Sequence, residues 1–271
     1  MKIGFIGIGN MAGAIVRGLI QTNMLPSEDI YASNRSPEKL EAFSKDTDIH
    51  SVASNKELIK LCDLVFLGAK PKDIPSLLKD LQPSLEQSKP TLVSMAAGIS
   101  LEQLEEMSDT SLPIIRVMPN LNSAVGQGMT AVCGNQTATE ENIDYVMNLF
   151  EAVGESVQIP EEQFSIFSAI AGCSPAFTFI YIDALARAAV RHGMQKDSAV
   201  KIAAQAVLGS GKLVRENDQS PMDLADQVAS PGGTTIEGVL SLLSGDFYSD
   251  IAQAVNAAYE KDQALLNKKK Q

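Results

Sequence analysis

The feature that most constrains the fold is a glycine-rich turn close to the N-terminus. It consists of Gly7, Ile8, Gly9, Asn10, Met11 and Ala12, in the pattern G-x-G-x-x-(G/A). An apolar run, Lys2–Gly7, leads into this turn, and an amphipathic helical pattern follows it. There the first glycine allows a tight turn, the second lets a pyrophosphate approach the backbone, and Ala12 lets helix and strand pack closely. The turn therefore predicts a dinucleotide site with six candidate contacts. The alternative is a plain glycine-rich turn.

Short apolar runs alternate with helical patterns through residues 1–160. After the first strand, Lys2–Gly7, further strands are predicted at Ile30–Ser33, Leu64–Leu67, Thr91–Ser94, Ile114–Val117 and Thr130–Val132, with a helix at Pro37–Ser44. Continuous apolar strands separated by helices indicate a parallel sheet that is covered on both faces. We therefore predict an α/β protein whose N-terminal domain, residues 1–160, is a Rossmann-type doubly wound sheet.

After about Pro160 the strand patterns stop and alanine-rich helical patterns take over. The predicted helices are Glu162–Ile170, Pro175–His192, Asp197–Glu216, Pro221–Val228, Gly232–Ser244 and Phe247–Lys268. The Pro175–His192 pattern is apolar nearly all round, so this helix must be buried. A helical domain of about 110 residues has a thin core for such a segment, which predicts packing against a second subunit. The sequence thus indicates an all-α C-terminal dimerisation domain, residues 161–271.

Charge and composition exclude several classes of function. The formal net charge of −11 argues against a protein that grips phosphate backbones, and the Lys268–Lys270 run is interpreted as a solvated tail. The three cysteines form no Cys-x-x-Cys pair, and the two histidines are too few for a histidine-rich zinc site or a Ser-His-Asp triad. No signal peptide is evident, and the apolar stretch Ala169–Ile182 is expected to be too short to span a membrane. We expect a cytoplasmic protein with no metal, nucleic-acid or membrane site.

The end of the second predicted strand bears on which dinucleotide binds. Ser33, Asn34, Arg35 and Ser36 stand where an NAD-selective site carries an acidic residue, about 20 residues past the glycines. A guanidinium and three small polar side chains suit a 2′-phosphate, which favours NADP, although a neutral loop also accepts NAD. Ser36 followed by Pro37 also fits a helix N-cap and first helical residue, and both roles can hold together.

Two further strand ends are candidates for the nicotinamide side of the site. After Leu64–Leu67 the chain continues through Gly68 with Ala69, Lys70 and Pro71. For Lys70 we favour a positioning role over proton transfer, and a plain surface residue is the alternative. Met95, Ala96 and Ala97 take the corresponding place after the next strand, where small residues permit close ligand approach.

The most informative motif of the second half is Ser230-Pro231-Gly232-Gly233-Thr234-Thr235. Serine at an N-cap and proline at the first helical position mark a helix start. Gly232 and Gly233 are then expected to bare their backbone N–H groups and form a site for a carboxylate or phosphate. Two threonine hydroxyls stand beside it. A well-capped helix with no ligand is the alternative.

These segments together carry a resemblance to pyrroline-5-carboxylate reductase. The segments are Gly7–Ala12, Gly68–Pro71, Ser94–Gly98, Arg116–Asn120, Gly172–Phe177 and Asp226–Thr235. The match runs in order over nearly the whole chain, and the Ser230–Thr235 segment is highly specific. Two departures are Cys173-Ser174, where the family usually has Ser-Gly, and Leu121-Asn122, where it often has Thr-Pro. Cys173 has apolar neighbours and is interpreted as an inert thiol rather than a nucleophile.

The resemblance implies NAD(P)H-dependent reduction of the cyclic imine 1-pyrroline-5-carboxylate to L-proline, the last step of proline biosynthesis. It implies a homodimer at least, often in a larger ring such as a decamer of dimers. Carried over by position, Thr235 hydrogen-bonds the substrate and is the candidate catalytic residue, while Gly233 and Thr234 hold the carboxylate. Ser230 and Gly232 are further candidate substrate-binding residues. Asn55 and Gln227 fall at cofactor-contacting positions, and Glu161 falls at a substrate-side position.

Two other functions stay open at this point. A β-hydroxyacid-dehydrogenase-like oxidoreductase also opens with a glycine-rich turn and ends in helices, but it needs a lysine base and leaves the Ser230–Thr235 motif unexplained. A non-catalytic NADP-sensing protein of the same fold is the second alternative, since a fold does not fix a function.

Overall fold

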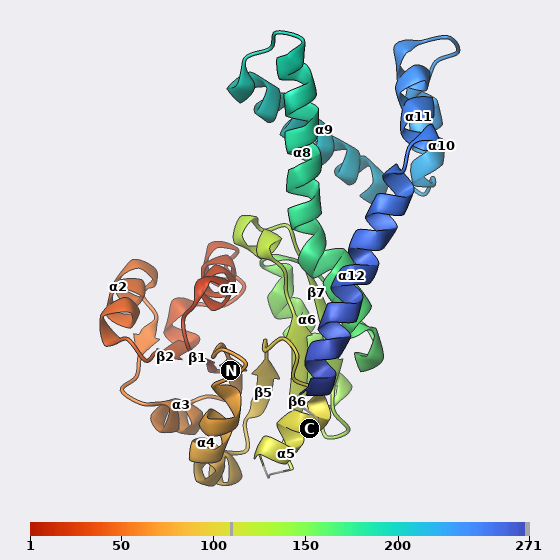
Figure 1. Ribbon diagram of the computed structural model, residues 1–271. Coiled ribbons are helices and arrows are strands. Elements are labelled where there is room, and N and C mark those ends of the chain that lie inside the picture. Colours follow the sequence, from red (N-terminus) through yellow and green to blue (C-terminus); the bar gives the residue numbers. More distant parts are fainter. Residues whose placement is uncertain (109–110, 269–271) are drawn as a thin grey trace. The chain divides into compact units, whose positions relative to one another are not determined.

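The computed structural model describes residues 1–108 and 111–268. The chain divides into two compact units (Figure 1). Unit 1 is Met1–Gly172 together with the chain from Tyr259 onward, and unit 2 is Cys173–Ala258. Of the predicted lysine tail only Lys268 lies within the described residues, where it ends the last helix.

Unit 1 is built on a sheet that, within the described residues, has eight strands in the order β3-β2-β1-β4-β5-β6-β7-β8. The strands are β1 (Ile3–Ile6), β2 (Ile30–Ser33), β3 (His50–Ser51), β4 (Leu64–Leu67), β5 (Thr91–Ser94), β6 (Ile114–Met118), β7 (Gly128–Gly134) and β8 (Gly154–Gln158). Neighbours pair in parallel except β6 and β7, which are antiparallel. Together with the helices that follow, this sheet confirms the predicted α/β fold class.

Helices cover both faces of the sheet, as the continuous apolar strands require (Figure 1). One face carries α1 (Asn10–Gln21), α2 (Pro37–Thr47) and α6 (Glu140–Glu151). The other carries α3 (Asn55–Leu61), α4 (Ile74–Ser88) and α5 (Leu101–Ser108). The predicted helix that begins at Pro37 is therefore present and runs three residues longer than expected.

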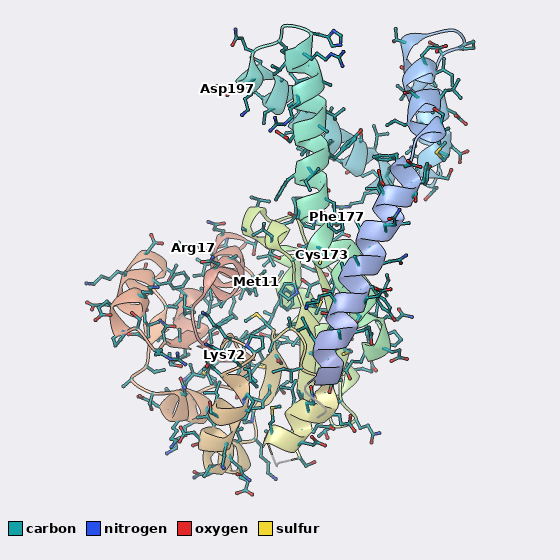
Figure 2. The ribbon with its side chains drawn as sticks, in the orientation of Figure 1. Met11, Arg17, Lys72, Cys173, Phe177 and Asp197 are labelled. Atoms are coloured by element: carbon teal, nitrogen blue, oxygen red, sulfur yellow. The ribbon has the colours of Figure 1, made fainter. Side chains whose placement is uncertain are left out.

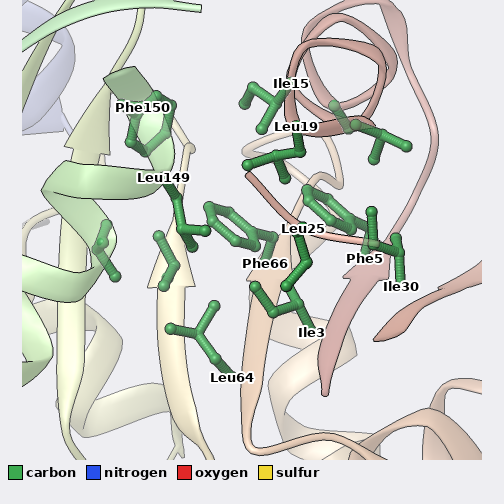
Figure 3. Packing of buried hydrophobic residues seen from close by; sticks show 14 of the residues in the cluster. Ile3, Phe5, Ile15, Leu19, Leu25, Ile30, Leu64, Phe66, Leu149 and Phe150 are labelled. Atoms are coloured by element: carbon green, nitrogen blue, oxygen red, sulfur yellow. The ribbon is translucent and has the colours of Figure 1, made fainter. Parts of the chain in front are cut away.

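Alternate residues of each strand supply the two cores. Phe5 and Phe66 point to the side of α1 and α6, where their rings stack with centroids 4.6 Å apart, and Phe150 meets Phe66 edge-on at 6.2 Å (Figure 3). Ile6 and Leu67, on the same two strands, belong to the core on the opposite side. Since each such side chain contributes about 1.5–3 kcal/mol when fully buried, this packing fixes the strand ends that form the site described below.

Unit 2 consists of helices and has little core of its own. Helices α8 (Ser174–Arg191) and α9 (Lys196–Arg215) lie side by side, followed by α10 (Pro221–Val228) and α11 (Thr234–Ser244) (Figure 1). Helix α12 (Phe247–Lys268) starts in unit 2 and ends in unit 1. The buried apolar side chains of α8 and α9, beyond Pro175 at the first turn, are the alanines Ala186, Ala199 and Ala203.

The expectation that the apolar helix α8 is buried is not met within this chain. Phe179 is 54% exposed and Ile180 is 70% exposed, and Ile202 on α9 is 56% exposed. The α8 sequence is apolar nearly all round as predicted, but within one copy of the chain α8 packs mainly against α9. An apolar surface of this kind marks an interaction site.

The expectation that the apolar stretch Ala169–Ile182 is too short to span a membrane is also wrong. A continuous helical run from Glu161 to Arg191 is long and apolar enough to cross a membrane, judged by length and composition alone. It passes through α7 (Phe164–Phe167) and a π-helical turn, Ser168–Cys173, before it enters α8. Those two criteria are also met by a helix that packs against protein.

Candidate active site

A cleft of about 960 Å³ opens in unit 1 at the carboxyl ends of β1, β2 and β4. Strand β1 lies between β2 and β4, so the strand order reverses at this point. Crevices at such a switch point are where doubly wound sheets bind dinucleotides. The predicted contacts that line the cleft are Gly7, Ile8, Gly9, Ser33, Asn34, Arg35, Ser36, Asn55, Ala69 and Lys70.

The two glycines of the turn do what the sequence predicts of them. Gly7 has a φ of +95°, and a Cβ there would lie 3.1 Å from the carbonyl oxygen of Gly68, so a side chain would be strained on both counts. A Cβ on Gly9 would meet nothing within 4 Å, which leaves the backbone open to a ligand. Gly9 is the N-cap of α1, and the first helical amides have no helical carbonyl partner. The start of α1 therefore offers backbone N–H groups and the positive end of a helix to an anion.

Three residues of the motif are placed away from this cleft. Ala12 is buried in the core between the sheet and helices α1, α2 and α6, and Met11, labelled in Figure 2, is partly buried against that core. Asn10 lines a neighbouring groove along α1. Ala12 thus has the predicted packing role, while Asn10 and Met11 do not line the cleft.

Asn34 braces the glycine turn from the end of β2. Its Oδ1 accepts a hydrogen bond from the backbone N–H of Ile8 at 3.2 Å, and its Nδ2 donates to the carbonyl of Ser36 at 3.1 Å. Ser33 donates to Asn55 Oδ1 at 2.7 Å from a side chain that is itself buried. Asn34 therefore holds the glycine turn in place, and Ser33 holds the start of α3 at Asn55. Ser36 is confirmed as the N-cap of α2, with Pro37 in its first turn.

The cleft is electrostatically positive although the chain is acidic. Its lining contains the cations Arg35, Lys39, Lys56, Lys70 and Lys72 and the acids Asp73 and Asp80. Two ion pairs form across it, Arg35 with Asp73 at 3.2 Å and Lys56 with Asp80 at 2.9 Å. This excess of cations suits a ligand that carries several phosphates.

Sequence reasoning missed Lys39, Lys56 and Lys72. Lys39 lies in the first turn of α2 and Lys56 in the first turn of α3, while Lys72 lies in the turn before α4 (Figure 2). Each stands just after a strand or at the start of a helix, on the side where the glycine turn also lies. Cations in the first turn of a helix that follows a parallel strand are the signal that would have identified Lys39 and Lys56, and cations in the turn before such a helix would have identified Lys72.

The remaining predicted cofactor contacts do not line the cleft. Met95, Ala96 and Ala97 follow β5, where Ala96 is buried and its N–H donates a hydrogen bond to Ser94 Oγ at 3.3 Å. Pro71 flanks the lining residues Lys70 and Lys72 without joining them. Gln227 lies on α10 in unit 2, where its Nε2 donates to Gln219 Oε1 at 2.7 Å.

Within the Ser230–Thr235 motif, residues 230–233 form a turn before α11 rather than the first turn of the helix. The helix starts at Thr234 with Gly233 as its N-cap, so the expectation of Ser230 as N-cap and Pro231 as first residue is wrong. The carbonyl of Ser230 accepts the N–H of Gly233 at 3.0 Å, and Gly232 has a φ of +68°. A Cβ on Gly233 would lie 2.4 Å from Ser230 Oγ. The positive φ therefore favours glycine at position 232, while a side chain at position 233 would require Ser230 Oγ to move.

This geometry moves the anion-binding donors along the chain. The amide of Gly233 is used by Ser230 and is not bare. Thr234 and Thr235 are the first two residues of α11. Their backbone N–H groups have no helical carbonyl four residues earlier to bind. A carboxylate would thus meet threonine amides and hydroxyls together, with Thr235 at the second helical position rather than one turn in.

Glu161 already has partners within unit 1. Its Oε1 accepts hydrogen bonds from Arg116 Nη1 at 2.7 Å and from the backbone N–H of Leu101 at 2.8 Å. The Arg116 side chain is 2% exposed and also stacks its guanidinium 4.6 Å from the ring centre of Phe164. Glu161 therefore neutralises a buried cation on β6, which the sequence alone did not indicate.

Asn120, from the Arg116–Asn120 motif, holds the π-helical turn. Its Nδ2 donates to the carbonyl of Ala171 at 2.9 Å, and its Oδ1 accepts the N–H of Met129 at 3.2 Å. A π-helical turn shifts the regular backbone bonding, and the buried amide of Asn120 supplies a partner for one of its carbonyls.

The cysteines are free thiols. Burial raises the pKa of Cys62 to about 12 and that of Cys133 also to about 12, so both remain neutral near pH 7. Neither thiol is activated as a nucleophile.

Comparisons with known proteins match two different parts of the chain. A family profile described as pyrroline-5-carboxylate reductase dimerisation matches residues 161–265. A second, described as NADP oxidoreductase, coenzyme F420-dependent, matches residues 2–98. The helical region thus matches a dimerisation domain, and the region around the cleft matches an NADP oxidoreductase domain.

Whole-chain relatives extend the match. Pyrroline-5-carboxylate reductase of Escherichia coli is 39% identical over 97% of this chain and 98% of its own. The Coxiella burnetii enzyme structure has a TM-score of 0.93 at 32% identity, over 97% of this chain and 98% of the other. The Plasmodium falciparum pyrroline carboxylate reductase with NADP bound has a TM-score of 0.86 at 32% identity, over 98% of each chain. With this identity along nearly the full length, the chain belongs to the pyrroline-5-carboxylate reductase family.

Proposed function

We infer that this chain is an NAD(P)H-dependent oxidoreductase that reduces 1-pyrroline-5-carboxylate to L-proline, the last step of proline biosynthesis. The observation that carries this function is the positive switch-point cleft in a chain of this family. A spectrophotometric assay of NADPH oxidation with pyrroline-5-carboxylate tests it. Turnover would support the function. Tight NADPH binding without turnover would instead favour a non-catalytic NADP-sensing protein.

The cleft residues fit the cofactor in two respects. The open backbone at Gly9 and the start of α1 suit the pyrophosphate, and five cations surround the space in which further phosphate would lie. When bound, the reduced nicotinamide supplies the hydride. Asn34 and Ser33 act indirectly, since they hold the loops whose backbone and cations meet the ligand. The finer assignment of Ala69, Lys70, Pro71, Met95–Ala97 and Gln227 to the cofactor is proposed from the family resemblance.

We expect Arg35→Ala to weaken NADPH binding selectively. A charge-assisted contact to phosphate contributes about 1.5–3 kcal/mol, so the Kd for NADPH should rise roughly tenfold or more. NADH lacks the 2′-phosphate and should lose little. Fluorescence titration of the purified protein with each cofactor measures both constants. An equal loss for both cofactors would contradict the proposed preference for NADPH.

The substrate is proposed to bind the turn before α11. Its carboxylate is held by the amides and hydroxyls at Thr234 and Thr235, while Ser230, Gly232 and Gly233 shape the turn. A cyclic imine is electrophilic when protonated, so the chain needs to orient it and need not bond to it covalently. Thr235 accepts a hydrogen bond from the iminium N–H in this proposal. Glu161 acts by fixing Arg116 rather than by donating a proton.

The β-hydroxyacid-dehydrogenase alternative required a lysine base in the helical region. Lys201 is exposed on α9, and Lys212 on the same helix pairs at 3.7 Å with Glu216, the residue that follows the helix. The imine reduction needs no such base, and it also gives the Ser230–Thr235 turn a use.

The chain oligomerises through its helical region. We propose a homodimer at least, in which a second copy covers the exposed apolar side chains of α8 and α9, with a decamer of dimers as the larger form. A soluble cytoplasmic enzyme is proposed, in keeping with three free cysteines, and protein rather than lipid covers the apolar helix. The functional domains are proposed as 1–160 and 161–271.

Light scattering at micromolar concentration should therefore give at least twice the mass of one 28.9 kDa chain. The physical reason is the exposed apolar area on α8 and α9, which association removes from water. A species of monomeric mass that keeps full activity would refute the proposed assembly.

A further inference from the structure

An ion pair spans the mouth of the cleft. Arg35 Nη2 lies 3.2 Å from Asp73 Oδ2, and both residues line the cleft. Arg35 follows β2 and Asp73 precedes α4, which follows β4, while β1 lies between those strands. The pair therefore connects the two loops on either side of the glycine turn.

The two partners differ in how firmly they are held. The Arg35 side chain is 86% exposed, whereas that of Asp73 is 27% exposed. The backbone N–H of Asp73 donates to the carbonyl of Lys70 at 2.8 Å, and its carbonyl accepts from Ser76 Oγ at 3.0 Å. When an anion enters, the guanidinium can turn toward it, but the carboxylate stays in its turn.

We propose that Asp73 sets the balance between the two cofactors by competing with the 2′-phosphate of NADPH for the Arg35 guanidinium. This inference rests on the proposed contact between Arg35 and that phosphate. Binding of NADPH must break the Arg35–Asp73 pair and brings a group of charge about −1.5 to −2 near the remaining carboxylate. NADH has no 2′-phosphate and leaves the pair intact. Asp73 thus lowers the selectivity for NADPH that the cations of the cleft would otherwise give.

The variant Asp73→Asn tests this in the full-length protein. Asparagine keeps the size of the side chain and remains a good N-cap for α4, whose cap makes no side-chain hydrogen bond. Exposed ion pairs are weak, so the Kd for NADPH should fall about two- to fivefold while that for NADH changes less than about twofold. Fluorescence titration with NADPH and with NADH gives the ratio of the two constants.

Asp80→Asn is the matched control. Asp80 lines the same cleft and pairs with Lys56 at 2.9 Å, so this variant removes the same charge without releasing Arg35. Its ratio of NADPH to NADH affinity should stay near that of the parent. An Asp80→Asn shift as large as that of Asp73→Asn would overturn the proposal, because the effect would then come from net charge alone.

Variants of Arg35 separate this inference from the cofactor assignment. In an Arg35→Ala background, Asp73→Asn should no longer change the ratio of affinities. If Arg35→Ala reduces NADPH affinity selectively but Asp73→Asn has no effect in the parent, competition by Asp73 is wrong and the assignment of Arg35 stands. If Arg35→Ala affects both cofactors equally, the assignment of Arg35 fails, and the inference fails with it.

Discussion

Thr235→Ala is expected to lower kcat/KM for pyrroline-5-carboxylate by about tenfold or more, from the loss of one hydrogen bond to a charged group. Thr235 is the second residue of α11, whose first amides lack a helical carbonyl partner. In the proposed complex these amides face the substrate carboxylate, and the hydroxyl accepts from the iminium N–H. That bond matters most before hydride transfer removes the positive charge. Steady-state kinetics with varied imine at saturating NADPH measures the loss.

Two comparisons make this result specific. Thr235→Ser keeps the hydroxyl and should retain most of the activity. The Kd for NADPH should change little in Thr235→Ala, because Thr235 is not among the residues that line the cleft of unit 1. Parental kcat/KM in Thr235→Ala would reduce the residue to a feature of the helix start, and the substrate site proposed on this turn would fail.

Glu161→Ala should destabilise the protein strongly. Removing this carboxylate leaves Arg116, with a side chain only 2% exposed, without its ion-pair partner, and Arg116 Nε and Nη2 already have no hydrogen-bond partner among the described residues. Breaking a fully buried pair costs about 3–5 kcal/mol, and the 28% exposure of Glu161 places the expected loss at about 2–3 kcal/mol. The thermal midpoint should fall by about 5–10 °C at a fixed protein concentration.

The adjacent residue provides the control for this variant. Glu162 is exposed and forms no ion pair with Arg116, so Glu162→Ala should shift the midpoint by no more than about 1–2 °C. Differential scanning fluorimetry on both variants gives the comparison. Equal midpoints for Glu161→Ala and the parent would show that the Arg116 charge is compensated elsewhere.

The fold was largely predictable because its strands are buried on both faces. Leu64–Leu67 and Thr91–Ser94 have the predicted bounds, since a run of apolar residues between turn residues has few alternatives. The strands that were missed lack that signal. His50 and Ser51 are both exposed, and Gly154–Gln158 includes Glu155 and Gln158 at exposed positions. Such strands form because a neighbouring edge is available, which no local pattern reveals.

The candidate site was predicted less completely, for a different reason. The glycine motif identifies the floor of the cleft by itself, because Gly7 and Gly9 have conformational and steric roles that other residues cannot fill. The cations at Lys39 and Lys56 meet there only because parallel strands bring separate helix starts to one edge. The helix start near Ser230 was misplaced by three residues, since Gly232 and Gly233 allow a turn that capping preferences alone do not predict.

The scarcity of buried side chains in unit 2 has a consequence for how this protein depends on its concentration. Beyond Pro175 in the first turn of α8, the buried side chains of α8 and α9 are alanines. This helix pair therefore gains little free energy from folding alone. Most of the stabilisation then comes from association, so folding of this unit and subunit binding are one equilibrium governed by mass action. Dilution should act on it as a denaturant does. Substitutions on the apolar faces of α8 and α9 would raise the protein concentration at which unit 2 folds, while the chemical step in the folded enzyme stays the same.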